Sequence, residues 1–209
     1  MTSEAADGYR RRRTEQREDS RVRILDAAVA CLIEGGIENA TTLQIQARAG
    51  ISRGGLLHHF PSRGALLVAA SQHLATLRLA VTAERAAQIA RVYPEGRDRL
   101  NHMVELLWEA SHEPQWWAAL ELWTSSRTDD EIAASLRPEE RRLGGVIRTL
   151  VDDMFGPACT GHPRYREVRE LLLSSMRGVA LTYTFERRDP SHDPHLDTWK
   201  TLVGQLLET

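Results

Sequence analysis

The segment from residue 40 to 63, ATTLQIQARAGISRGGLLHHFPSR, constrains the fold of this chain more than any other part of it. Ile45 and Leu56 each have an apolar partner four residues further on, and Gly50 separates the two pairs. Residues four apart lie on the same face of an α-helix, so the spacing predicts two short helices with one shared apolar seam. Gly50 can adopt the left-handed conformation that a tight turn between helices requires, and Ser52 can cap the second helix. The segment is therefore predicted to be a helix-turn-helix.

The second helix carries unusual residues for a helix packed inside a protein. Gly54 and Gly55 are both interior, and each glycine costs a helix about 1 kcal/mol relative to alanine. Close approach to another surface explains two adjacent glycines, because bare amides and the positive end of the helix can then reach a phosphate. A loose loop is the alternative, but the apolar spacing continues across the glycines. The pattern favours an exposed helix that binds DNA.

The run AGISRGGLLHHFPSRGALL resembles the signature of the TetR (tetracycline-repressor) family of bacterial transcriptional regulators. In that family a Gly-hydrophobic-Ser turn leads into a recognition helix that ends in an aromatic residue, and Pro-Ser-Lys/Arg opens the next helix. The resemblance covers residues 21–67. It implies an all-α regulator, most often a repressor, that binds a palindromic operator as a homodimer and is released by a small effector.

The resemblance also implies which residues contact DNA. Thr42 is expected to open the first motif helix and bind a phosphate, and Arg63 is expected to clamp another. The recognition helix supplies the remaining predicted contacts: Arg53, Gly54, Gly55, Leu57, His58 and His59. Leu57 replaces the usual Tyr, which removes a hydroxyl that contacts phosphate and favours contact with a thymine methyl instead. Gln46 replaces the usual Ala.

The distribution of charge and the helix-breaking residues divide the chain into three parts. Residues 1–20 are predicted to be a flexible basic arm, which is either a solvated charge run or an arm that adds affinity through counterion release and enters a minor groove. Residues 21–63 form the predicted DNA-binding domain. Residues 10–63 hold ten arginines and six acidic residues, whereas residues 64–209 hold 17 basic and 21 acidic residues. The positive charge is therefore concentrated where a polyanion would bind.

Helical periodicity continues through residues 64–209, the predicted ligand-binding and dimerisation domain. The predicted fold is all-α with about nine helices: three in the helix-turn-helix domain and the others in a larger C-terminal domain. The predicted helices cover residues 21–34, the two short motif helices, a long helix from 63 to Pro94, and 97–111, 114–126, 129–155, 164–188 and 195–207. Pro138 is expected to kink or split its helix. The predicted core of the first domain is Ile24, Leu32, Ile37, Ile45, Leu56 and Phe60.

Aromatic residues gather in one part of the C-terminal domain, where four of the five tryptophans lie between Trp108 and Trp123. The cluster is either ordinary core or the apolar wall of a small-molecule site. His102 and His112 beside it suggest a mostly apolar effector with one hydrogen-bonding group. The predicted ligand-binding residues are His102, Met103, Leu107, Trp108, Trp116, Trp117, Leu120 and Trp123.

The last two predicted helices carry broad apolar stripes. Two such stripes on helices joined by a short loop suit a helical hairpin that pairs with a second copy of the chain. Packing within one chain is the alternative. The predicted dimer interface consists of Leu172, Met176, Val179, Tyr183, Trp199, Leu202, Val203 and Leu206.

Other functions have less support in the sequence. A helical enzyme that uses the tryptophan-lined pocket and a metal-sensing regulator are the alternatives, but no nucleophile elbow, phosphate-binding glycine loop or paired-cysteine motif is present. We therefore expect no catalytic residue, no metal and no cofactor. No apolar run reaches about 18 residues and no secretory segment is evident, so the chain is expected to be cytoplasmic, without a membrane partner.

Overall fold

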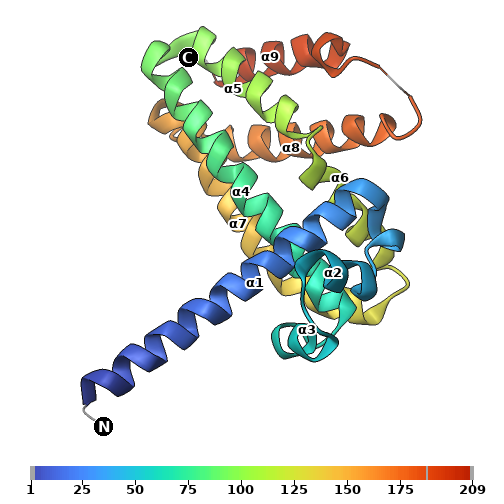
Figure 1. Ribbon diagram of the computed structural model, residues 1–209. Helices are drawn as coiled ribbons and strands as arrows, with labels where there is room; N and C mark the ends of the chain where they lie inside the picture. The colour runs from blue at the N-terminus through green and yellow to red at the C-terminus, as the bar shows by residue number, and fades with distance from the viewer. Residues whose placement is uncertain (1–2, 187, 208–209) are drawn as a thin grey trace. The chain divides into compact units, whose positions relative to one another are not determined.

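The computed structural model describes residues 3–186 and 188–207. Nine α-helices, one short 3-10 helix and no strand occupy these residues, which confirms the all-α prediction (Figure 1). The α-helices are α1 (Ser3–Asn39), α2 (Thr42–Ala49), α3 (Arg53–His59), α4 (Arg63–Val92), α5 (Gly96–Ala110), α6 (Pro114–Ser125), α7 (Asp130–Thr160), α8 (Tyr165–Thr182) and α9 (Pro194–Leu207), and the 3-10 helix η1 (Pro190–His192) precedes α9.

The helices form two compact units. Unit 1 consists of Met1–Leu74 and Ala118–Glu140, and unit 2 consists of Ala75–Trp117 and Arg141–Thr209. Both α4 and α7 contribute residues to each unit. The helix-turn-helix therefore folds together with the first part of α4, the last part of α6 and the first part of α7, whereas the sequence placed a boundary at residue 63.

One apolar cluster stabilises unit 1. Five of the six predicted core residues are buried in it, and the sixth, Ile37, is partly buried against it. Leu122 of α6 and Ile132 and Leu136 of α7 belong to the same cluster. A three-helix unit of this size buries little apolar surface by itself, and these side chains from later in the chain supply more.

α1 begins well before the predicted helix. The sequence predicted a flexible arm over residues 1–20, whereas the structure has a helix from Ser3 whose only non-helical residue is Gly36, with φ 66°. Arginine, glutamate and glutamine are good helix formers, and Arg11 bonds to Glu15 one turn away at 3.0 Å. Helix propensity and local ion pairs account for this exposed segment, which has no apolar periodicity to reveal it.

Two other predictions about helix continuity are corrected. Pro138 does not break α7, whose only non-helical residue is Gly156. Pro138 and Ala134, the residue one turn earlier, are both exposed, so water can bind the carbonyl that proline leaves without a donor. α8 ends at Thr182 instead of continuing to residue 188.

A second apolar cluster stabilises unit 2, and it draws on α4, α5, α7, α8 and α9. Met103, Trp108 and Trp199 are among its most buried large side chains. Of the described helices, α4 is the one whose length and apolar composition would allow it to cross a membrane. A core helix passes the same test, and α4 supplies Leu66 and Leu67 to the core of unit 1.

Candidate nucleic-acid interface

Caps and one glycine set the turn between α2 and α3. Gly50 has the left-handed conformation, with φ 62° and ψ 40°. The hydroxyl of Ser52 accepts a hydrogen bond from the backbone N–H of Gly55 at 3.2 Å, which caps α3. Thr41 caps α2 in the same way, so that this helix begins at Thr42 as predicted. The predicted turn chemistry is confirmed.

α3 has one buried side and one exposed side. Leu56 and Phe60 are 2% and 5% exposed and belong to the core of unit 1. The predicted DNA contacts on the exposed side are Arg53, Gly54, Leu57 and His58, while Gly55 and His59 are half-buried. The exposed side thus combines a guanidinium, an imidazole and an apolar side chain, all of which can contact base edges in a major groove.

The two adjacent glycines of α3 differ in their surroundings. A Cβ at Gly55 would lie 2.8 Å from Cγ1 of Ile51, so the turn itself excludes a side chain there. A Cβ at Gly54 would meet no atom within 4 Å. Packing within unit 1 therefore explains Gly55 but not Gly54.

The carboxyl end of α3 lies beside cationic side chains of α1. The guanidinium carbon of Arg21 is 5.5 Å from the centre of the Phe60 ring. Burial lowers the pKa of His59, and charge interactions with His58, Arg17 and Arg21 lower it further. The ring of His59 is therefore neutral at pH 7, within a region of positive charge that two helices share.

Arg63 makes contacts that the sequence did not predict. Its Nε donates to the carbonyl of Ala40 at 3.1 Å, and its Nη2 donates to the carbonyl of Ile37. Arg63 thus ties the start of α4 to the last turn of α1 and to Ala40, which follows it. The phosphate-clamping role of Arg63 stays a prediction.

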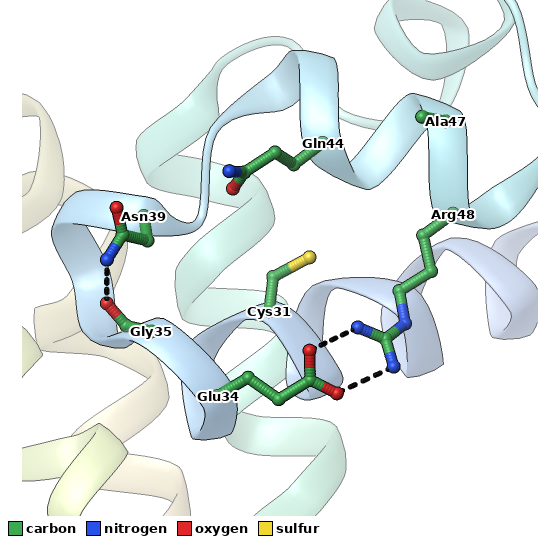
Figure 2. A pocket seen from close by; sticks show the side chains of 7 residues that line it. All are labelled: Cys31, Glu34, Gly35, Asn39, Gln44, Ala47 and Arg48. Carbon is green, nitrogen blue, oxygen red and sulfur yellow. Dashed lines mark hydrogen bonds and ion pairs between the residues drawn. The ribbon is translucent and has the colours of Figure 1, made fainter.

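An ion pair beside a pocket fixes α2 against α1 (Figure 2). The two terminal nitrogens of Arg48 donate to the two carboxylate oxygens of Glu34 at 2.6 and 2.7 Å. These hydrogen bonds hold the pKa of Glu34 below its ordinary value. The pocket has a volume of about 480 Å³ and includes Cys31 and Gln44. The end of α1 is fixed as well, because the N–H of Ile37 donates to Oε2 of Glu121 in α6 at 2.6 Å.

Sequence reasoning missed one exposed apolar residue of this region. Leu43 is 76% exposed at the start of α2. It lies two positions before the buried Ile45, which places it about 200° around the helix, opposite the apolar seam. The sequence shows this offset. An exposed leucine alone, however, does not indicate a binding residue unless the interface is known.

The predicted ligand-binding residues do not form one site. Met103, Leu107 and Trp108 are buried in the core of unit 2, and Trp116 packs against it. Trp123 packs against the core of unit 1, and Leu120 belongs to the same unit. His102 bonds to Glu105 at 3.0 Å, and Trp117 is half-buried. The buried members of the set belong to the two cores, and their role in ligand binding stays a prediction.

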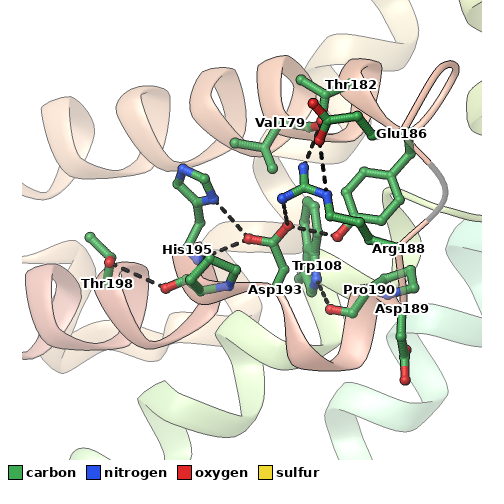
Figure 3. Close-up of polar contacts among 12 residues, drawn as sticks. Trp108, Val179, Thr182, Glu186, Arg188, Asp189, Pro190, Asp193, His195 and Thr198 are labelled. Atoms are coloured by element: carbon green, nitrogen blue, oxygen red, sulfur yellow. Dashed lines mark hydrogen bonds and ion pairs between the residues drawn. The ribbon is translucent and has the colours of Figure 1, made fainter.

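A different group of residues surrounds Trp108. Its indole N–H donates to the carbonyl of Pro190 at 2.7 Å, which fixes η1 to α5 (Figure 3). The buried carboxylate of Asp193 accepts from the Tyr183 hydroxyl at 2.6 Å and from the backbone N–H of His195 at 2.8 Å. Burial, together with the hydrogen bond to Asp193, raises the pKa of Tyr183 to about 12. Burial alone would raise the pKa of Asp193, but its hydrogen bonds lower it overall.

His112 has a buried ring nitrogen without a hydrogen-bond partner. Its Nδ1 lies 3.0 Å from the carbonyl of Trp108 and must carry the proton of that hydrogen bond. Nε2 is then an acceptor, and it is buried with no partner among the described residues. The ring lies 4.1 Å from Trp108 and 4.8 Å from Tyr183, centre to centre. Burial lowers the pKa of His112, which keeps Nε2 unprotonated.

Much of the predicted dimer interface lies inside unit 2. Leu172, Met176, Trp199 and Val203 are at most 4% exposed, so the structure assigns these four side chains to the core instead of to a partner. Val179, Tyr183 and Leu206 are half-buried, and Leu202 is 38% exposed. The sequence showed the apolar stripes but not which stripe faces the same chain.

No group of three or more His, Cys, Asp or Glu side chains among the described residues is arranged to hold a metal ion. Besides the pocket in Figure 2, a hollow of about 530 Å³ lies along α7 and includes Val146 and Asp153. Neither is lined by a predicted ligand-binding residue.

Residues 24–70, which contain the helix-turn-helix, the end of α1 and the start of α4, match the family model of the bacterial regulatory proteins of the TetR family. Over this stretch, which is less than half of the chain, the sequence is similar to that family. The curated relatives that it matches include proteins named as HTH-type transcriptional regulators and repressors.

Two curated relatives show the extent of the similarity. The repressor AcnR of Corynebacterium efficiens is 30% identical over 134 residues, which cover 62% of this chain and 63% of AcnR. The regulator CymR of Pseudomonas putida is 25% identical over 182 residues, which cover 85% of this chain and 86% of CymR. The matched part is also 63% of Rv2912c, a regulator of Mycobacterium tuberculosis. The chain therefore covers less than two thirds of the length of AcnR and of Rv2912c.

A solved structure of a transcriptional regulator from Saccharomonospora viridis, in complex with choline, has the same fold. It superposes with a TM-score of 0.59 at 20% identity and covers 91% of this chain and 96% of that one. At this identity the likeness concerns the fold alone.

The contrast between the two glycines gives a stability test. Gly54→Ala should stabilise the protein by up to about 1 kcal/mol, because alanine favours the helix and the added methyl meets no atom. Gly55→Ala should lower stability by about 1–2 kcal/mol relative to Gly54→Ala, because Ile51 must move. Urea unfolding followed by circular dichroism measures both. Equal effects of the two substitutions would contradict the described packing.

Proposed function

We propose that the chain is a transcriptional repressor that binds a palindromic DNA operator through α3 as a homodimer, and that a small, mostly apolar effector releases it. The observation that carries the DNA-binding part is Gly54. This glycine weakens an exposed helix, and nothing within unit 1 requires it. A DNA duplex that lies close to α3 at this position would explain why the residue has no side chain.

In this proposal residues 21–63 are the DNA-binding domain, and the rest of unit 1 supports it. Arg53 offers paired donors of the kind that recognise guanine, and Leu57, 50% exposed, offers an apolar contact for a thymine methyl. Thr42, His58 and His59 contact the backbone or base edges. The exposed Leu43 adds a second apolar contact from α2.

The proposed dimer uses the side of α8 that unit 2 leaves uncovered. Leu171 and Leu181 are 59% and 45% exposed, and Ser174 and Gly178 between them are also exposed. Along α8 these four residues are three, four and three positions apart, which is the spacing of contact residues between two packed helices. With the exposed Leu202 of α9, this row replaces the buried part of the predicted interface. A dimer of this kind would place two copies of α3 in successive major grooves.

The proposed effector site is centred on His112, Trp108 and Tyr183 in unit 2. Three aromatic rings supply apolar walls, and Nε2 of His112 supplies one acceptor that lacks a donor. An unpaired buried acceptor costs about 1–3 kcal/mol, which a ligand with an O–H or N–H group would recover. The effector is therefore an aromatic or similarly apolar molecule that carries one donor.

Effector binding would act through a change of conformation. The ring of His112 contacts those of Trp108 and Tyr183, so a ligand that reaches Nε2 must separate these rings and move the end of α5 against Tyr183 at the end of α8. α4 packs against α5 in the core of unit 2 and continues into unit 1. A ligand that favours the DNA-incompetent state by about 1–3 kcal/mol is sufficient for such coupling.

The DNA-binding proposal is tested with Gly54→Ala. The added methyl should weaken binding at least about tenfold, because it occupies the space where the duplex approaches. The probe is a duplex that the wild-type protein selects from a random-sequence library, with fluorescence anisotropy as the readout. The matched control is Gly145→Ala in α7, where a Cβ also meets no atom within 4 Å. Unchanged affinity of the stabilised Gly54→Ala protein would remove α3 from the interface.

DNA binding should strengthen as the pH falls from 8 to 6. Free His59 is neutral at pH 7 because its pKa is lowered by burial and by His58, Arg17 and Arg21, while Glu18 opposes this. Nearby phosphates favour the protonated ring and raise its pKa, so binding takes up a proton. Affinity should rise by up to about tenfold per pH unit for each bound subunit, and His59→Gln should flatten the profile. The control is His192→Gln in η1. A profile that His59→Gln leaves unchanged would exclude this linkage.

The effector site is tested with two matched probes, 1-naphthol and 1-methylnaphthalene. Only 1-naphthol can donate to Nε2 of His112, so it alone should raise the melting temperature and release the selected duplex. His112→Phe should abolish the difference between the probes, while folding and DNA binding persist. Equal binding of both probes to the wild-type protein, or a difference that survives in His112→Phe, would contradict the proposed site.

A further inference from the structure

The exposed part of α1 has a one-sided distribution of charge. Arg13, Arg17 and Arg21 follow one another at four-residue spacing, so they lie within about 80° of each other around the helix. We refer to these three residues as the basic face of α1. Glu15 and Asp19 lie about 160–200° around the helix from Arg17. The modest net charge of this segment therefore conceals a cationic ridge about 12 Å long.

The basic face leads to the end of α3. Arg21 lies over the Phe60 ring, and both Arg17 and Arg21 are close enough to lower the pKa of His59. Glu18 borders the face and lies 3.9 Å from Arg21. The basic face and the carboxyl end of the recognition helix thus belong to one continuous surface of unit 1. From there the N-terminal half of α1 runs outward, away from α2 and α3 (Figure 1).

We propose that the basic face of α1 binds the phosphate backbone that flanks the groove occupied by α3. This inference rests on the proposed function and extends the DNA footprint beyond the helix-turn-helix. The binding mode differs from that of a flexible arm. An α-helix with side chains is about 10–12 Å wide, whereas the minor groove is about 6 Å wide, so α1 cannot enter that groove as a helix.

A helical extension has particular energetic consequences. Its arginines are already spaced along a rigid rod, so the backbone entropy that a disordered arm loses on binding is not lost again. Phosphates carry no sequence information, so the basic face should add affinity equally to every sequence. Each phosphate that it neutralises should add about 0.9 to the salt dependence of binding.

The test compares two double substitutions with the same change in net charge. Arg13→Gln with Arg17→Gln removes two members of the basic face. Arg11→Gln with Arg12→Gln removes two arginines that lie about 120–140° around the same helix from Arg17. Glutamine preserves helix propensity, which circular dichroism checks. The probe is the selected duplex with ten base pairs of unselected sequence on each side, titrated between 50 and 200 mM salt.

The first double variant should reduce the salt slope by about 1.8 units per bound subunit, which is about a tenfold change across that salt range. The control variant should leave the slope near its wild-type value. Shortening the flanks should weaken the wild-type protein but not the first variant. An unchanged slope in the first variant, or an equal loss in the control, would overturn the proposal while DNA recognition stands. Failure of the wild-type protein to select any sequence would overturn DNA recognition and this extension together.

Discussion

The apolar seam between α2, α3 and the rest of unit 1 is the constraint on which the other features depend. Ile45 and Leu56 are buried against α1 and α4, and Leu122 and Ile132 close the same core from later in the chain. Because the seam fixes one side of α3, the opposite side is held outward as a rigid surface. Gly50, Ser52 and the Arg48–Glu34 pair then set the angle at which that surface is presented.

Unit 2 has a different physical character, with buried polar groups that are mostly but not fully satisfied. Asp193 organises the chain before α9 through Tyr183 and His195, whereas Nε2 of His112 has no donor. A saturated network stabilises one conformation, and an unsatisfied acceptor next to it leaves free energy for a ligand to recover. A domain with both features can be ordered in the absence of a ligand and can still change conformation when a ligand binds.

Local chemistry was predictable from the sequence, and packing partners were not. The turn, the caps and the buried side of α3 follow from Gly50, Ser52 and the spacing of apolar residues. The extension of α1 was missed because charged helix formers give no apolar periodicity. The stripe of Leu172 and Met176 was assigned to a partner because periodicity identifies an apolar face but not its neighbour. Trp108 and Trp123 were grouped by sequence proximity, yet they pack in different cores.

The central claim is that α3 enters the major groove of DNA, once per subunit of a dimer. Dimethyl sulfate protection tests it most directly, because guanine N7 lies in the major groove and adenine N3 in the minor groove. On the selected operator, the account predicts two clusters of protected guanine N7 positions whose centres lie about one helical turn apart. Protection of adenine N3 alone, or no protected N7 on a duplex that the protein demonstrably binds, would contradict it.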